Sequence, residues 1–181
     1  KHNGGIRALA LIEVDQFHKA AREFRKIIPK FDVKDYPKLL SFISKNNMPG
    51  LTFRLAAILR NDYGQIHLGG LYPIPEWKMD TSDLKDRALV YAIARQESGF
   101  NPRAKSSSKA MGVLQIIPST AAFIMKNREY RLRRSKNHLL YNPPHNILIA
   151  SKYIKFLLNL PIVNQDLMWM LASYNAGPGN F

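Results

Sequence analysis

Hydrophobic residues recur at helical spacing through the first third of the chain. Between residues 6 and 28 the apolar positions fall every three or four residues, at Leu9, Ile12, Ala20, Phe24 and Ile27. Such spacing is typical of helices that bury one face. The pattern is interrupted near Asp15 and ends at Pro29, which cannot continue a helix. This segment is therefore predicted to form a helical hairpin.

A second pair of apolar segments follows, at Tyr36–Ile43 and Leu51–Leu59. The residues Asn46–Gly50 that join them have the composition of a turn. Almost no part of the chain alternates between apolar and polar residues as a strand would. We therefore predict an all-α protein whose N-terminal segment consists of helical hairpins.

Glycine and proline interrupt the helical pattern between residues 63 and 77. Pro73 and Pro75 exclude a regular helix there, because proline lacks the backbone donor and clashes with the preceding turn. We place the domain boundary in this segment. The predicted domains are residues 1–71 and residues 72–181.

Composition adds a strong positive charge to this picture. Lys and Arg number 27 against 13 acidic residues, a formal net charge of +14, which favours an anionic partner. The basic residues are spread along the chain, and the densest run, Lys126–Lys136, has only Tyr130 as an aromatic residue. We therefore expect no nucleic acid partner. A solvated basic face and attraction to an acidic polymer, such as a peptide-bearing cell wall, remain as alternatives.

Other classes of protein are disfavoured by missing patterns. The histidines His2, His18, His67, His138 and His145 have no ligand-pair spacing, so no metal site is expected. No glycine-rich phosphate loop follows a strand and no Gly-x-Ser-x-Gly motif occurs, so we expect no cofactor and no serine hydrolase. No apolar run approaches the roughly 20 residues that span a membrane.

One carboxylate stands at the predicted end of a helix. Thr81 or Ser82 can cap a helix that runs to about Glu97, and Gly99 supplies the left-handed residue that commonly closes one. The negative end of the helix should raise the pKa of Glu97, which suits a general acid.

The alternative for Glu97 is a structural ion pair with Arg95 or Arg103. The number of acidic residues helps to decide between a general acid and an ion pair. Between positions 98 and 181 the acidic residues are Glu129 and Asp166. Most glycoside hydrolases use two carboxylates. The scarcity favours a reaction in which the substrate itself supplies the nucleophile.

Four ordered motifs then carry a family resemblance. They are Ala94–Pro102 (ARQESGFNP), Gly112–Pro118 (GVLQIIP), Asn146-Ile147 with Tyr153-Ile154, and Ser173–Gly177 (SYNAG). Together they resemble the successive motifs of soluble lytic transglycosylases, the lysozyme-like enzymes that cleave peptidoglycan. The resemblance covers about residues 72–181, and the first 70 residues resemble more loosely the linker segment before the catalytic domain. It implies helical hairpins followed by a lysozyme-like α-helical catalytic domain.

The resemblance also implies an activity and a site. Glu97 would protonate the oxygen between N-acetylmuramic acid and N-acetylglucosamine, and would then act as a base while the sugar's own 6-hydroxyl closes a 1,6-anhydro ring. Ser106 and Gln115 would hydrogen-bond sugar substituents, and Tyr153 and Tyr174 would line the cleft. The full set of expected substrate-binding residues is Ser98, Ser106, Gln115, Tyr153, Tyr174 and Asn175.

Two other functions stay open from the sequence: a lysozyme-type peptidoglycan hydrolase, and a non-catalytic module for wall binding or scaffolding. Peptidoglycan strands are the expected partner and the periplasm or cell wall the expected location, with assembly partners and oligomeric state open. The family usually has glycine or a small residue where Lys109 stands. It also continues beyond the position of Phe181, so we expect the catalytic domain to be truncated at its C-terminus.

Overall fold

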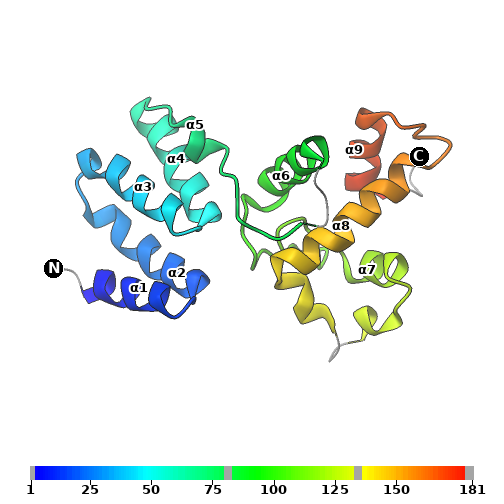
Figure 1. Ribbon diagram of the computed structural model, residues 1–181, viewed down its shortest axis with the longest axis horizontal. Helices are drawn as coiled ribbons and strands as arrows, with labels where there is room; N and C mark the ends of the chain where they lie inside the picture. The colour runs from blue at the N-terminus through cyan, green and yellow to red at the C-terminus, as the bar shows by residue number, and fades with distance from the viewer. Residues whose placement is uncertain (1–2, 80–82, 133–135, 178–181) are drawn as a thin grey trace. The chain divides into compact units, whose positions relative to one another are not determined.

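The computed structural model describes residues 3–79, 83–132 and 136–177. The chain divides into two compact units (Figure 1). Unit 1 comprises Lys1–Trp77 and Gly99–Asn101, and unit 2 comprises Lys78–Ser98 and Pro102–Phe181. In the described ranges every regular element is a helix, and backbone pairing is limited to isolated bridges. The predicted all-α class is confirmed, and the expected boundary between residues 71 and 72 stays a prediction.

Unit 1 begins with the expected helical hairpin. Helices α1 (Asn3–Glu13) and α2 (Phe17–Ile27) are separated by a turn at Asp15, which has a left-handed backbone with φ of 56°. A short 3-10 helix, Ile28–Lys30, follows, with Pro29 near its start. The predicted interruption and the predicted end of this hairpin are both confirmed.

The second hairpin is also present. Helices α3 (Tyr36–Lys45) and α4 (Pro49–Tyr63) pack against each other, and the short helix α5 (Leu68–Leu71) packs on α4. Pro49 occupies the first turn of α4, where a missing N–H costs nothing. Gly64 ends this helix with φ of 68°.

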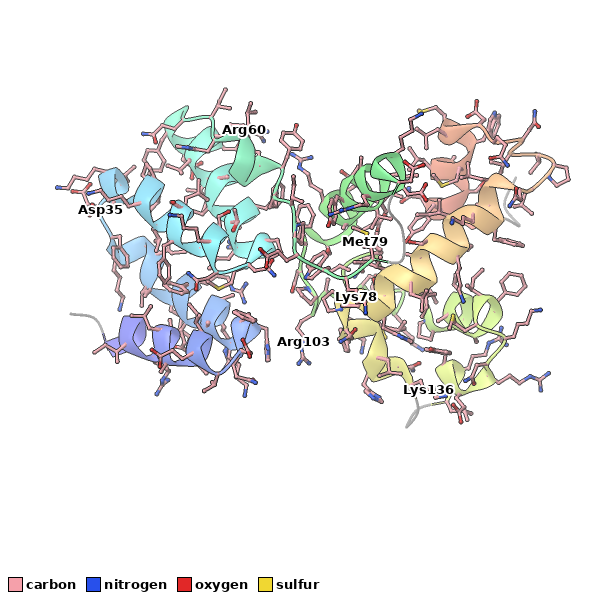
Figure 2. All side chains as sticks on the ribbon, viewed as in Figure 1. Asp35, Arg60, Lys78, Met79, Arg103 and Lys136 are labelled. Carbon is pink, nitrogen blue, oxygen red and sulfur yellow. The ribbon has the colours of Figure 1, made fainter. Side chains whose placement is uncertain are left out.

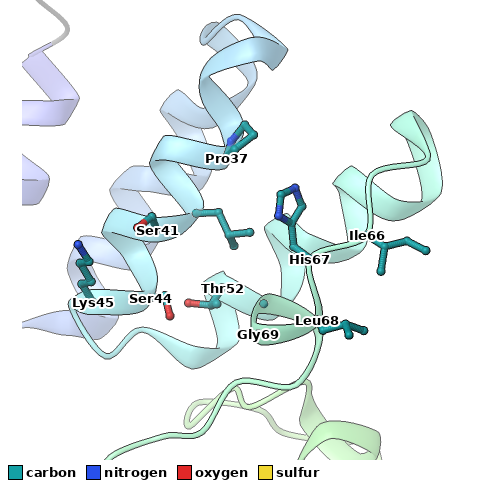
Figure 3. A pocket seen from close by; sticks show the side chains of 11 residues that line it. Pro37, Ser41, Ser44, Lys45, Thr52, Ile66, His67, Leu68 and Gly69 are labelled. Atoms are coloured by element: carbon teal, nitrogen blue, oxygen red, sulfur yellow. The ribbon is translucent and has the colours of Figure 1, made fainter.

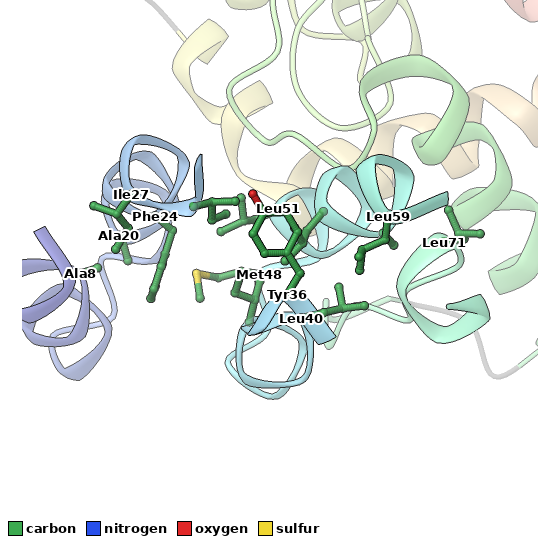
Figure 4. Packing of buried hydrophobic residues seen from close by; sticks show 14 residues of the cluster. Ala8, Ala20, Phe24, Ile27, Tyr36, Leu40, Met48, Leu51, Leu59 and Leu71 are labelled. Atoms are coloured by element: carbon green, nitrogen blue, oxygen red, sulfur yellow. The ribbon is translucent and has the colours of Figure 1, made fainter. Parts of the chain in front are cut away.

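The core of unit 1 lies between these helices (Figure 4). Its fully or nearly buried members include Ala8, Ala20, Phe24, Ile43, Leu55, Ala56 and Leu59. One prediction from the apolar spacing is wrong: Leu9 is 46% exposed, and Ala8 is the residue of α1 that is fully buried. Helix α1 packs mainly against α2, so only a narrow stripe of its surface is covered.

An open groove of about 660 Å³ lies on unit 1 (Figure 3). It is lined by α3, by Thr52 of α4 and by the segment Ile66–Gly70. Ile66 and Leu68 are 67% and 66% exposed. Its lining residues belong to unit 1, whereas Glu97 belongs to unit 2.

Unit 2 is organised around one helix. Helix α8 (Pro143–Leu158) contacts α6 (Leu84–Ser98), α7 (Pro118–Ile124) and α9 (Leu167–Ala176), as Figure 1 allows the reader to follow. The 3-10 helices Arg128–Arg131 and Lys136–Tyr141 lie between α7 and α8 in the chain. The buried residues of α8 include Asn146, Ile147, Ile149, Ala150, Tyr153, Ile154 and Leu157.

Helix starts in unit 2 follow ordinary capping chemistry. The side chain of Asn142 accepts a hydrogen bond from the His145 N–H at the start of α8, and that of Asp166 accepts one from the Trp169 N–H at the start of α9. The expected caps of α6, Thr81 and Ser82, lie outside the described residues. Among the helices that the structure describes, none combines the length and apolarity needed to cross a membrane.

Candidate active site

Glu97 lies in the last turn of α6, as predicted. Gly99 follows with a left-handed φ of 57°. The carboxyl group is partly buried, and this burial raises its pKa above the ordinary value. The direction of the predicted shift is thus confirmed, and burial is its cause. Within the described residues no positive charge offsets this rise, so the alternative of an ion pair with an arginine finds no support there.

Ser98 connects the end of α6 to a second segment of unit 2. Its hydroxyl Oγ lies 2.8 Å from the carbonyl oxygen of Val113 and donates to it. Val113 belongs to the turn Gly112–Gln115, which we call the glutamine turn. The residue after Glu97 is therefore bonded to this turn, and a role for Ser98 in binding substrate stays a prediction.

The glutamine turn is the end of a tightly closed loop. Met111 forms isolated bridges with both Lys105 and Ile116. Gln115 has a left-handed φ of 48°, and its side-chain Nε2 donates to the Gly112 carbonyl oxygen at 2.8 Å. The side chain that was expected to bind sugar is thus held by its own turn.

Ser106 serves the other end of this loop. Its Oγ accepts a hydrogen bond from the Ala110 N–H at 3.1 Å, and its backbone N–H donates to the Ala110 carbonyl. These bonds close the loop locally. No hydrogen bond joins Ser106 to Glu97 or Gln115 in the part of the chain that the structure describes, and its binding role stays a prediction.

Tyr174 of α9 reaches the same turn. Its hydroxyl donates to the Leu114 carbonyl oxygen at 2.7 Å. Burial raises the pKa of Tyr174 well above its ordinary value, and the negative charge of Glu97 raises it further. Tyr174 and Glu97 are therefore close enough to interact electrostatically. The ring of Tyr174 lies 5.4 Å from that of Tyr153, which is buried in α8 at 6% exposure.

The last motif has the composition of a turn, but the structure places most of it on a helix. Tyr174 and Asn175 lie within α9, and the helix continues through Ala176 before Gly177 leaves it with φ of 86°. Asn175 is exposed, and its Nδ2 donates to the Leu171 carbonyl one turn earlier at 3.1 Å. The sequence of small and polar residues resembled a turn, but hydrogen bonding within the helix extends it.

Asn146 belongs to one of the four family motifs, but no role was predicted for it from the sequence. Its Oδ1 accepts from the Leu114 N–H at 2.8 Å, and its Nδ2 donates to the Met111 carbonyl at 3.0 Å. Asn146 is fully buried in α8. The signal in the sequence was a polar residue followed by the apolar run Ile147–Ala150, at the start of a helix with a long buried face.

Three other carboxylates of unit 2, Glu129, Asp166 and Asp86, can be placed by an ion pair or by their position on a helix. Glu129 forms an ion pair with Lys136 at 2.7 Å (Lys136 is labelled in Figure 2). Asp166 caps α9, eight residues before Tyr174 and so about 12 Å away along the helix. Asp86 precedes Glu97 by eleven residues on α6, about 16 Å along its axis. Paired catalytic carboxylates lie about 5–10 Å apart, so Asp86 is too far along α6 to form such a pair with Glu97.

The atypical Lys109 occupies a position that suits glycine. Its φ is 65° and its side chain is exposed. A left-handed backbone costs a residue with a Cβ about 1–2 kcal/mol, partly offset by the larger entropy that glycine loses on folding. Lys109→Gly is therefore expected to raise the free energy of unfolding by about 0.5–1 kcal/mol in urea denaturation. Lys109→Ala, which keeps the Cβ, is the control, and a loss of stability in the glycine variant would contradict this reading.

No group of three or more His, Cys, Asp or Glu side chains that could hold a metal ion occurs among the described residues. The structure brings Ser98, Gln115 and Tyr174 together on the glutamine turn, with Tyr153 behind Tyr174. Glu97 directly precedes Ser98 in the chain, and its negative charge raises the pKa of Tyr174. This arrangement can present one weakly acidic carboxyl group beside a rigid turn.

The second half of the chain is similar to known proteins. The family model described as Transglycosylase SLT domain matches residues 78–181. The soluble lytic murein transglycosylase of Salmonella typhimurium is 39% identical over 93 residues, which are 51% of this chain and 14% of that relative. The membrane-bound lytic murein transglycosylase C of Mannheimia succiniciproducens is 33% identical over 99 residues, which are 52% of this chain and 28% of that relative. The chain thus spans a minor part of these relatives.

The crystal structure of the 70-kDa soluble lytic transglycosylase of Escherichia coli has the same fold. Its TM-score is 0.74 at 24% identity, over 96% of this chain and 28% of that one. This coverage includes the helical hairpins of unit 1, which confirms the predicted fold class of hairpins followed by a lysozyme-like helical domain. Because the family model covers more than half of the sequence, the chain belongs to the Transglycosylase SLT domain family.

Proposed function

We infer that this chain carries the catalytic site of a lytic murein transglycosylase. The enzyme would cleave the β-1,4 bond between N-acetylmuramic acid and N-acetylglucosamine in peptidoglycan and leave 1,6-anhydro ends. The observation that carries this proposal is Glu97: a partly buried carboxyl group with a raised pKa, beside Tyr174 and the glutamine turn. The names of the matched relatives agree with the reaction class.

In the proposed reaction one carboxyl group acts twice. The Glu97 carboxylic acid donates its proton to the glycosidic oxygen as the bond from that oxygen to the anomeric carbon breaks. The carbonyl oxygen of the 2-acetamido group assists at the anomeric carbon. The Glu97 carboxylate then takes the proton of the 6-hydroxyl, whose oxygen bonds to the anomeric carbon and displaces the acetamido oxygen. Glu97 ends protonated and no water is consumed.

The surroundings of Glu97 support this cycle. A general acid works best when its pKa lies near the operating pH, and burial moves the pKa of Glu97 in that direction. Among the described residues, Glu129 and Asp166 each have a structural partner, so an intramolecular nucleophile from the sugar explains how one carboxylate suffices.

The neighbouring side chains would bind and orient the glycan. Gln115 would bond a sugar hydroxyl or acetamido group, for which its Oε1 acceptor is available beside the Nε2 bond to Gly112. Tyr174 would hold the wall of the cleft next to Glu97. Ser98, Ser106, Tyr153 and Asn175 would complete the binding surface, with Ser98 and Tyr153 acting mainly by supporting it.

The net charge of +14 fits a substrate that carries peptide carboxylates. Peptidoglycan is therefore the proposed partner, and the periplasm is the proposed location.

The raised pKa of Glu97 predicts how stability and activity vary with pH. Because the folded protein holds this proton more tightly than the unfolded chain, the contribution to stability is complete below the unfolded pKa and is lost as pH rises through the folded pKa. Activity should fall over the same upper range as the acid ionises. The gain in melting temperature of Glu97→Gln over wild type should therefore grow as the pH rises above about 4.3, the ordinary pKa of a glutamate. A gain that does not change with pH would contradict the assignment.

Digestion of purified murein tests the proposed function. Soluble fragments separated by chromatography and weighed by mass spectrometry should carry 1,6-anhydro ends, one water lighter than reducing ends. Fragments with reducing ends would instead identify a lysozyme-type hydrolase. Sedimentation of the protein with murein and no release of fragments would identify a non-catalytic binding module.

A further inference from the structure

Asn146 is a buried polar side chain whose amide oxygen and amide nitrogen each make a hydrogen bond. It is fully buried in α8. Its two amide atoms bond the backbone of the loop at two points, the Leu114 N–H at 2.8 Å and the Met111 carbonyl at 3.0 Å. Since one atom accepts and the other donates, the orientation of the amide is fixed by its partners. A side chain with no exposed surface cannot touch a glycan, so any effect on the reaction must pass through the backbone that it holds.

The glutamine turn lies directly on this side chain. A Cβ added at Gly112 would meet the Leu140 carbonyl oxygen and the Asn146 Nδ2, the latter at 2.6 Å. Gly112 also has a left-handed φ of 79°. The turn is therefore closely packed where it contacts Asn146 of α8. A displacement of the Asn146 side chain would displace the turn as well.

Residues of the candidate site also bond to this turn. The Leu114 N–H donates to the Asn146 Oδ1, and the Leu114 carbonyl oxygen accepts from the Tyr174 hydroxyl. The neighbouring Val113 carbonyl receives the Ser98 hydroxyl, one residue after Glu97. Gln115 follows Leu114 directly and bonds back to Gly112. A shift of Leu114 would thus move three of the expected site residues at once.

We propose that Asn146 is a positioning residue for the glycan cleavage: it clamps the glutamine turn from the side of α8 and so sets the orientation of Gln115 and the carbonyl groups that Ser98 and Tyr174 bind. This inference rests on the proposed function. It adds to that function a residue that lies in the core of unit 2 and acts through the backbone of the turn.

A double-mutant cycle with Gln115 tests the clamp. Asn146→Ala should lower kcat/KM on murein fragments by about 10–100-fold, because small displacements of positioning groups cost this much. In a Gln115→Ala background, Asn146→Ala should lower kcat/KM by a factor at least about fivefold smaller, because its effect passes largely through Gln115. Equal losses in both backgrounds would overturn the proposal.

The matched control is Leu157→Ala, a fully buried position further along α8 that is not part of the turn or of the site. Assayed well below the melting temperatures of both variants, Leu157→Ala should keep kcat/KM within about twofold of wild type, since it removes packing and leaves the turn bonded. A loss equal to that of Asn146→Ala would show that general destabilisation explains the effect and would overturn the clamp.

A readout without turnover separates this inference from the proposed function. Amide hydrogen exchange by NMR should show the Leu114 N–H protected in the wild type and exposed in Asn146→Ala, with the side-chain amide resonances of Gln115 shifted. Asn146→Asp serves if the alanine variant does not fold, because its carboxylate keeps the acceptor for Leu114 and loses the donor to Met111. In Asn146→Asp the Leu114 N–H should remain protected from exchange, and the side-chain amide resonances of Gln115 should still shift. If wild type releases no glycan, the proposed function fails, and unchanged Leu114 and Gln115 signals in the variants would independently overturn the clamp.

Discussion

Glu97→Gln is expected to lower the turnover of murein by at least about 10²-fold, because general acid and base catalysis contributes about 10²–10⁴-fold and the amide can do neither. The substitution keeps the size of the side chain and removes the titrating proton. Binding should persist, since Gln115 and Tyr174 remain bonded to the turn. Initial rates of fragment release and co-sedimentation with intact murein measure the two effects separately.

The matched control for this result is Glu129→Gln, which removes another carboxylate of unit 2. Glu129 is exposed and paired with Lys136, and exposed ion pairs contribute little to stability. Its turnover should stay within about twofold of wild type. Turnover of Glu97→Gln within a few-fold of the control would contradict the role of Glu97 as the acid.

Gly112→Ala is expected to lower the free energy of unfolding of unit 2 by about 2–5 kcal/mol, the sum of a left-handed backbone with a Cβ and an overpacked contact. The added Cβ meets the Leu140 carbonyl, a backbone atom that cannot rotate away. Chemical denaturation followed by Trp169, which lies in α9, reports on this unit.

Gly64→Ala separates the two contributions. Gly64 is also left-handed, with φ of 68°, yet nothing lies within 4 Å of an added Cβ. Its cost should be about 1 kcal/mol, from the backbone conformation alone. Trp77, in unit 1, reports on that side of the chain. If Gly64→Ala and Gly112→Ala lower the free energy of unfolding equally, the glutamine turn relaxes around the added Cβ. The close contact of Gly112 with Leu140 and Asn146 would then not be rigid.

Local signals in the sequence were sufficient for much of the helical architecture. Apolar spacing, Pro29 and the turn Asn46–Gly50 predicted both hairpins of unit 1, because each hairpin depends on residues that are neighbours in the chain. Gly99 predicted the end of α6 for the same reason. The exposed Leu9 was misjudged because the pattern does not say how much of a helix its neighbours cover.

Contacts between distant residues were beyond such patterns. Asn146 bonds Leu114 across 32 positions, and Tyr174 bonds the same residue across 60. The motifs indicated which residues belong to one site. The structure shows which of these residues bond to each other. The helical state of Asn175 was missed because turn-forming residues also occur in the last turn of a helix.

The most direct test of the central claim, that Glu97 drives cleavage without consuming water, is digestion of murein in water enriched in ¹⁸O, with mass spectrometry of the new glycan ends. We predict 1,6-anhydro ends that carry no ¹⁸O in the wild type, and no new ends above background in Glu97→Gln. New reducing ends that carry ¹⁸O would contradict the account, because they would show that water, and not the 6-hydroxyl of the sugar, is the nucleophile.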